Sequence, residues 1–289
     1  MTSSEKTPAV MPVRRNLNFN LPTERVSDWH SGSVHISHFL NAMSIFFPVG
    51  ERFFIDSVRH YRDRVTDPQL QEAVKGFMGQ EAMHGREHDD YNDALTAKGM
   101  PADKYENIVL KLLNFFRRFT PKGSQLAGTI ALEHLTAILA HRLLSDKSSM
   151  AQAEPRYAAL WQWHALEETE HKAVAFDVYA NVMKVKPLAY LRRCVALVLS
   201  TFIFFVMLTP FYIGLVRREK GQLFNLKGWW QVTVFLWGPR GVLLRALPDW
   251  FDFFKPGFHP WDHDNREFLS EIDDLVVEVE GYGAQGATA

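Results

Sequence analysis

The stretches GQEAMHGREH (residues 79–88) and HALEETEH (residues 164–171) decide how this sequence folds, because each places a His three positions after a Glu. The two pairs are Glu81 with His84, and Glu168 with His171. Residues three apart lie on one side of an α-helix, so each pair can offer a carboxylate and an imidazole to one metal ion. One such pair is common on helix surfaces, but two in one chain indicate a shared metal centre.

Two further carboxylates stand inside apolar stretches on either side of these motifs. Glu51 lies in FFPVGERFF (residues 46–54) and Glu133 lies in GTIALEHLTAIL (residues 128–139). A carboxylate on a buried helix face is unfavourable unless it is paired or bound to a metal. Ion pairs, for instance with Arg52 or Arg142, are the alternative for each. The order Glu, Glu-x-x-His, Glu, Glu-x-x-His is typical of ferritin-like di-metal carboxylate bundles.

Apolar periodicity and breaker residues predict the helices that carry these groups. We expect long helices over residues 33–65, 68–98, 124–144 and 155–185, with a shorter connecting helix over residues 101–119. Pro48 predicts a kink in the first of them. The sequence thus predicts an all-α, ferritin-like four-helix bundle in which the connecting helix forms part of a long crossover between two helical hairpins.

Two more histidines lie one helical turn from the motifs. His164 precedes Glu168 by four positions, and we expect it either to be a seventh ligand or to be an ordinary core or surface histidine. His88 is expected behind the ligands or at the surface. Ligating imidazoles usually donate their other N–H to an acceptor, for which Asp177 and Asp56 are candidates. Three glutamates are expected to face solvent: Glu87, Glu167 and Glu170.

Composition narrows the partners and the metal. The 32 Lys and Arg nearly balance the 33 Asp and Glu, which gives no reason to expect nucleic acid as a partner. The single cysteine, Cys194, excludes an internal disulfide and a thiolate metal site. His and carboxylate ligands suit iron, manganese or zinc. The N-terminal segment lacks the apolar run of a signal peptide, so we expect the bundle in the cytoplasm.

The C-terminal part of the sequence is more apolar. Residues 194–216 carry no charge, and 23 helical residues at about 1.5 Å each are long enough to cross a bilayer. A buried core helix is the alternative. We expect association with the inner membrane. The chain then divides into a disordered leader (1–32), the di-metal bundle (33–186), an apolar membrane-associated helical segment (187–256), and an acidic tail with a short helix (257–289).

Four stretches resemble a bacterial family of predicted metal-dependent hydrolases over roughly residues 14–220. They are SHFLNAMSIFFPVGERFFI (37–55), GQEAMHGREHDDYN (79–92), ALEHLTAILA (131–140) and WHALEETEHKAVAFDVY (163–179). The ligand order also resembles ferritin-like di-iron oxygenases. The pattern of His164, Glu168 and His171 is similar to that of p-aminobenzoate N-oxygenase-type enzymes, which use an additional histidine. The resemblance implies these metal ligands: Glu51, Glu81, His84, Glu133, His164, Glu168 and His171.

These observations lead to one expected function and two alternatives. We expect a non-haem protein with two iron ions, or else manganese or zinc. It would be an oxidoreductase that activates O₂, takes electrons from a donor and oxidises a lipophilic small molecule. A metal-dependent hydrolase with the same ligands is the first alternative, and a non-catalytic iron-binding bundle is the second. A homodimer is an open alternative for the assembly. Five side chains are expected to line the substrate pocket: Phe46, Phe47, Phe54, Phe77 and Met78.

Overall fold

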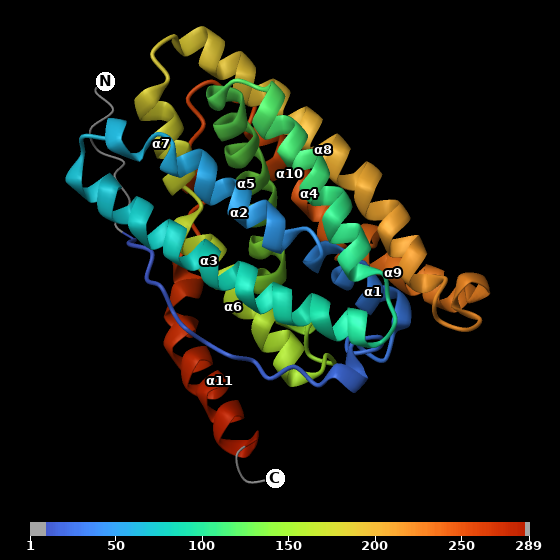
Figure 1. Cartoon of the computed structure of the whole chain (residues 1–289). Coiled ribbons are helices and arrows are strands. Elements are labelled where there is room, and N and C mark those ends of the chain that lie inside the picture. The colour runs from blue at the N-terminus through green and yellow to red at the C-terminus, as the bar shows by residue number, and fades with distance from the viewer. Residues whose placement is uncertain (1–9, 287–289) are drawn as a thin grey trace.

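The computed structural model describes residues 10–286, and within that range it contains helices and no strand beyond one isolated bridge between His30 and Ala153. The all-α prediction is therefore confirmed. The α-helices are α1 (Val34–Ser44), α2 (Phe47–Arg59), α3 (Pro68–Ala97), α4 (Ala102–Phe119), α5 (Lys122–Ser145), α6 (Pro155–His171), α7 (Val174–Val182), α8 (Lys186–Val216), α9 (Leu226–Trp237), α10 (Val242–Asp252) and α11 (Ile272–Gly286). Figure 1 shows their arrangement.

Local sequence explains several of the helix ends. Ser33 accepts a hydrogen bond from the backbone N–H of Ile36 and so caps α1, and Asp67 caps α3 in the same way just before Pro68. Gly99, with φ of +78°, adopts the left-handed conformation that ends α3.

Two of the predicted helices are interrupted. The helix expected over residues 33–65 is divided into α1 and α2, with Pro48 in the first turn of α2 rather than at a kink. The helix expected over residues 155–185 is divided into α6 and α7, so that α6 ends at His171.

Helices α2, α3, α5 and α6 form the four-helix bundle. Helix α2 packs along α3 and α5 packs along α6, while α2 also touches α5 and α3 touches α6. Helix α4 makes the connection from α3 to α5 and lies on the outside of α2 (Figure 1). This is the expected pairing of two hairpins through a long crossover, and it turns one face of each helix toward a common interior.

The N-terminal segment corrects one prediction. Residues 10–32 form a strap along the bundle, visible as the dark blue trace in Figure 1, and Phe19 and Trp29 on this strap are fully buried. The Phe19 ring lies 5.3 Å from that of Trp163 on α6. The prediction of a disordered leader is wrong for residues 10–32, because these aromatic side chains complete the core; residues 1–9 lie outside the described range.

The segment expected to be membrane-associated packs on the bundle. Helix α8 lies against α5 and α1, α9 against α1, and α10 against α5, while α11 leans on α6. Helix α8 is, among the described residues, the one helix long and apolar enough to cross a membrane. Its buried side chains include Ala189 near one end, Leu197 and Leu208 between, and Leu215 near the other end, so α8 packs on the rest of the protein along its length.

Candidate metal centre

The bundle interior gathers the seven side chains that the sequence singled out. Two groups form, one of Glu51, His84 and His164 and the other of Glu81, Glu168 and His171, and within each group the potential ligand atoms lie within 4.8 Å of one another. All six residues are buried. Glu133 joins the second group, with its Oε2 3.6 Å from Nε2 of His171. Each of the four bundle helices therefore contributes at least one carboxylate.

Glu168 lies between the two groups. Its Oε1 is 3.1 Å from Nε2 of His164, and its Oε2 is 3.6 Å from Nε2 of His171. The hydroxyl of Thr136 donates a hydrogen bond to the same Oε2 over 2.7 Å. With one oxygen facing each group, Glu168 could serve as a ligand in either of them, and Thr136 fixes its orientation.

The donor atoms of the centre lack the hydrogen bonds that buried polar groups normally make. Both side-chain oxygens of Glu51, Glu81 and Glu133 have no hydrogen-bond partner. The same holds for Nδ1 of His84 and for Nε2 of His171, although the latter lies 3.2 Å from Glu81 Oε1. Folded proteins rarely leave buried polar atoms unpaired. Two divalent cations would occupy these atoms and balance the four carboxylates, so the donor set fits a two-metal centre.

The electrostatics of the centre follow from burial and mutual proximity. Burial raises the pKa of Glu51, Glu81 and Glu133, and neighbouring carboxylates add to the rise, although His171 partly offsets it at Glu81. Although burial acts in the opposite direction, the charge of the adjacent His171 holds the pKa of Glu168 below its usual value, and Glu168 and Glu81 in turn raise the pKa of His171 in spite of its burial. Burial lowers the pKa of His84, and His164 and His171 lower it further. A neutral imidazole is the form that binds a metal.

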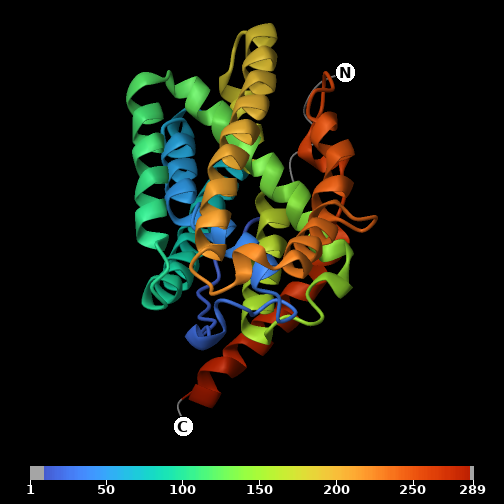
Figure 2. The same cartoon turned by 90° about the vertical axis from the view of Figure 1, so that its right-hand side faces the viewer.

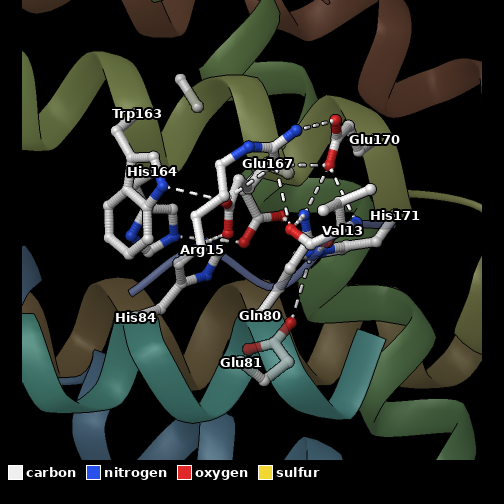
Figure 3. Close-up of polar contacts among 12 residues, drawn as sticks. Val13, Arg15, Gln80, Glu81, His84, Trp163, His164, Glu167, Glu170 and His171 are labelled. Atoms are coloured by element: carbon white, nitrogen blue, oxygen red, sulfur yellow. Dashed lines mark hydrogen bonds and ion pairs between the residues drawn. The ribbon is translucent and has the colours of Figure 1, made fainter. Parts of the chain in front are cut away.

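An outer layer of hydrogen bonds orients two of the imidazoles (Figure 3). Nε2 of His84 donates to Glu167 over 3.1 Å, which leaves Nδ1 directed at the centre. Nδ1 of His171 donates to the side-chain oxygen of Gln80 over 2.9 Å, which leaves Nε2 for the metal. These tautomers are assigned from the hydrogen bonds, and a fixed tautomer is the usual contribution of residues behind metal ligands.

Arg15 connects Glu167 with Gln80, the second of them through Glu170. Its guanidinium hydrogen-bonds Glu167 at 3.0 Å and Glu170 at 2.8 Å, and Glu170 in turn accepts a 2.5 Å hydrogen bond from Gln80. Figure 3 shows Arg15 lying over Glu167 and Glu170, on the side of the two imidazoles that faces away from Glu81. The N-terminal strap thereby fixes both histidines through one charged side chain.

His164 has its own supporting chain. The Ser44 hydroxyl donates its proton to Asn92, so it can only accept from Nδ1 of His88, 2.9 Å away. The other ring nitrogen of a neutral His88, Nε2, then accepts from Nδ1 of His164 over 2.9 Å. Nε2 of His164 then carries the lone pair and faces Glu168. His88 thus lies behind the candidate ligand, one of the two positions expected for it.

The close approach of α2 and α3 depends on a glycine. A Cβ on Gly85 would lie 3.3 Å from Oε2 of Glu51 and 3.8 Å from the backbone of Pro48. The first distance is tighter than an ordinary carbon–oxygen contact. A glycine at this position lets the Glu51 carboxylate reach the centre beside His84 on the same helix.

Several expectations about the surroundings were wrong. Glu87, Glu167 and Glu170 are buried rather than solvated, because the N-terminal strap covers this side of the bundle. The proposed acceptors lie elsewhere, Asp177 paired with His259 and Asp56 paired with Arg117.

The alternative ion pairs for the two isolated glutamates do not form either. Arg52 pairs with Asp89 and Glu106, and Arg142 pairs with Asp249. Glu51 and Glu133 are therefore not paired with these arginines and remain candidate metal ligands.

An apolar cavity reaches the centre. It has a volume of about 320 Å³ and lies between α2, α4, α5 and α8, with Glu51 and Thr136 among its lining residues. A second cavity of about 70 Å³ reaches His164 and Glu168. Of the five side chains expected at the pocket, three line the larger cavity: Phe46, Phe47 and Phe54. Phe77 instead packs edge-on against His171, and Met78 packs against the adjoining core.

Comparison with known proteins agrees with a metal-dependent activity. Residues 13–264 match the model of a family described as predicted metal-dependent hydrolase. No curated protein and no solved structure matches the chain. The match covers the strap, the bundle and helices α8 to α10, so the parts that build the centre and its cavity all lie inside it.

Proposed function

The chain belongs to the family of predicted metal-dependent hydrolases, and on that premise we propose that it is a two-metal hydrolase of an apolar substrate. One observation supports this most: two groups of buried ligand atoms, most of them without a hydrogen-bond partner, lie beside an apolar cavity that Glu51 lines. The proposed ligands are those expected from the sequence: Glu51, Glu81, His84, Glu133, His164, Glu168 and His171.

The two cavities differ in size and would bind different molecules. The larger one is lined mainly by Leu, Phe and Val side chains, so it suits an alkyl or acyl chain and excludes water from it. Glu51 and Thr136 also line it, so the reacting end of such a substrate would lie beside the centre. The smaller cavity, about 70 Å³, has room for one or two small molecules such as water.

Metal ions held here would lower the pKa of a bound water molecule and polarise the scissile carbonyl, which is the chemistry that hydrolysis needs. The protein residues supply orientation. Thr136 holds Glu168, and Glu167 and Gln80 hold the two imidazoles by the hydrogen bonds described above. The family description favours this reaction over the oxidative one expected from the sequence.

Oxygen activation by two iron ions is the second candidate, and one observation favours it. The supporting chain through His88 leaves His164 with a free Nε2, which adds a third imidazole to four carboxylates. Mixed His and carboxylate ligation suits iron(II) and O₂. In that case the smaller cavity would admit O₂, and an electron donor would be required.

One experiment separates the two reactions. The purified protein is stripped with a chelator and reloaded anaerobically with zinc, manganese or iron(II), and each form is given long-chain acyl esters with and without O₂ and a reductant. Hydrolase function predicts metal-dependent release of fatty acid without O₂. Oxygen consumption by the iron form without ester cleavage would favour the second candidate. A chain that takes up no metal would overturn both.

The cavity can be tested with a matched pair of variants. A Cβ on Gly128 meets no atom within 4 Å, and Gly128 lines the larger cavity. Gly128→Phe should fill the cavity and abolish turnover of long acyl chains at unchanged metal content, whereas Gly128→Ala should keep that turnover. Equal loss in both variants, or no loss in either, would contradict the assigned route.

A further inference from the structure

The exposed apolar side chains are concentrated on one surface. Of the 22 large apolar side chains that are exposed among the described residues, 19 lie on α4, α8, α9, α10 and the 3-10 helix Gln222–Phe224. The most exposed of them include Phe224 (84%), Leu226 (81%) and Trp230 (68%). Soluble monomers rarely expose apolar patches of such extent. We call this surface the apolar face.

The helices of the apolar face lie side by side around α8. Tyr105 of α4 stacks on Phe211 of α8 with ring centroids 4.4 Å apart. Trp250 of α10 donates a hydrogen bond to Thr201 of α8 over 3.0 Å, and α9 packs against α10. Figure 2 shows α4, α8, α9 and α10 on the side of the molecule that faces the viewer.

Charge separates this part of the chain from the rest. Residues 102–119 and 186–252, which carry the apolar face, contain 13 Lys and Arg and five Asp and Glu. The whole chain has 32 basic and 33 acidic residues, so the remainder has 32 − 13 = 19 basic and 33 − 5 = 28 acidic residues. A surface that is apolar and basic, on an otherwise acidic protein, is complementary to a membrane with anionic headgroups.

Helix α8 cannot use this surface to cross a bilayer while it is packed as observed. Its inner side is buried against the bundle at Leu197 and again at Leu208 and Leu215, and only the outer stripe, for example Leu191, Val198 and Phe202, is exposed. Helices α5 and α1 pack on that inner side, so a span in this arrangement would carry their polar side chains into the hydrocarbon. With one side on the bundle, α8 has only its outer stripe to offer to lipid.

The larger cavity opens on the same surface. Val195 and Leu199 of α8 line it and are themselves about half exposed. A substrate chain could therefore pass between the apolar face and Glu51 without crossing water. This geometry connects the location of the apolar face to the proposed chemistry.

We propose that the apolar face docks into one leaflet of a membrane containing anionic lipid, with α8 parallel to the membrane plane, so that the cavity takes its substrate directly from the lipid. The location of the docking surface is independent of the reaction. The direct supply of substrate rests on the proposed function.

Vesicle flotation of the full chain tests the docking. We expect binding to phosphatidylcholine vesicles that contain about 30% phosphatidylglycerol and weaker binding without it. The double variant Phe202→Asp with Trp230→Asp should reduce binding by about tenfold or more. Val277→Asp is the matched control, because Val277 is 70% exposed on α11, away from the apolar face. Equal binding by both variants would overturn the proposal.

Labelling of thiols at the two ends of α8 distinguishes a helix that docks in the membrane plane from one that spans the membrane. In a Cys194→Ser background, Lys184→Cys and Lys220→Cys place thiols beyond the two ends of α8. A membrane-impermeant maleimide should label both thiols from the same side of the membrane, and so in only one of the two vesicle preparations, inside-out or right-side-out. Labelling of one end from each side would show a span and overturn the in-plane orientation.

Two controls keep the docking separate from the chemistry. The metal content of the vesicle-binding variants should equal that of the unmodified chain, so loss of docking at full metal content leaves the proposed function intact. A stable dimer in light scattering that buries the apolar face and fails to float with vesicles would instead assign the face to a second copy.

Discussion

The Arg15→Met substitution examines how the N-terminal strap supports the centre. Arg15 makes hydrogen bonds of 3.0 Å to Glu167 and of 2.8 and 2.9 Å to Glu170, and its side chain is 14% exposed. The carboxylates it binds are 0% and 7% exposed. Methionine keeps the apolar stem of the side chain and removes only the charge and the donors. The substitution therefore leaves two carboxylates buried without their cation.

The expected loss of stability follows from these contacts. Removal of one partner of a buried ion pair costs about 3–5 kcal/mol. Burial already raises the pKa of Glu167 to about 7, even though Arg15 acts against it, so this carboxyl can take up a proton near neutral pH at little further cost. We therefore expect the lower end of the range, about 3 kcal/mol in the free energy of unfolding.

Urea unfolding of the metal-free protein measures this loss, with Arg25→Met as the matched control. Arg25 belongs to the same N-terminal segment and pairs with Asp28 at 3.0 Å, but both side chains are nearly half exposed. Its replacement should change stability by about 0.5 kcal/mol. If Arg15→Met proved no more destabilising than Arg25→Met, the strap would not hold the buried carboxylates in the way the structure indicates.

Three further outcomes are expected. Gln80→Leu should weaken metal binding about 10- to 100-fold in chelator competition while the chain stays folded, and unchanged affinity would mean that this amide does not orient its imidazole. Gly76→Ala should make the strap more susceptible to proteolysis, because a Cβ would collide with the carbonyl of Pro12. Gly128→Ala is the control: its Cβ would lie in open space and should stabilise α5 by roughly 0.5–1 kcal/mol. Burial lowers the pKa of His30, so just below about pH 6.5 the unfolded chain takes up this proton and the folded chain does not. The free energy of unfolding should therefore decrease as the pH falls. His30→Gln should reduce this pH dependence, and an unchanged dependence would assign the titration to another group.

Sequence reasoning singled out the inner side chains that the structure brings together. Helical spacing alone puts Glu81 beside His84 and Glu168 beside His171, and a carboxylate in an apolar stretch marks Glu51 and Glu133 as unusual. These sequence features depend only on local spacing or periodicity, so they can be recognised without knowledge of the tertiary structure. The all-α class and the crossover follow from the same periodicity.

The outer parts could not be predicted, because they depend on which segment covers which face. Helical angle assigns Glu167 and Glu170 to a surface, but the strap turns that surface into an interior by bringing Arg15 to it. Residues 10–32 carry little periodicity, and only Phe19 and Trp29 could have indicated that the segment packs. Likewise, an uncharged run at residues 194–216 cannot distinguish a spanning helix from one that lies against a bundle with its outer side exposed.

Metal content of the purified chain tests the central claim most directly. Elemental analysis after reloading should give two metal ions per chain, since there are two groups of donors. Glu168→Ala should lose at least one of them, because Glu168 faces both groups. Glu72→Ala, an exposed carboxylate on α3, should keep both. A chain that holds no metal, or a Glu168→Ala variant with full occupancy, would contradict the account.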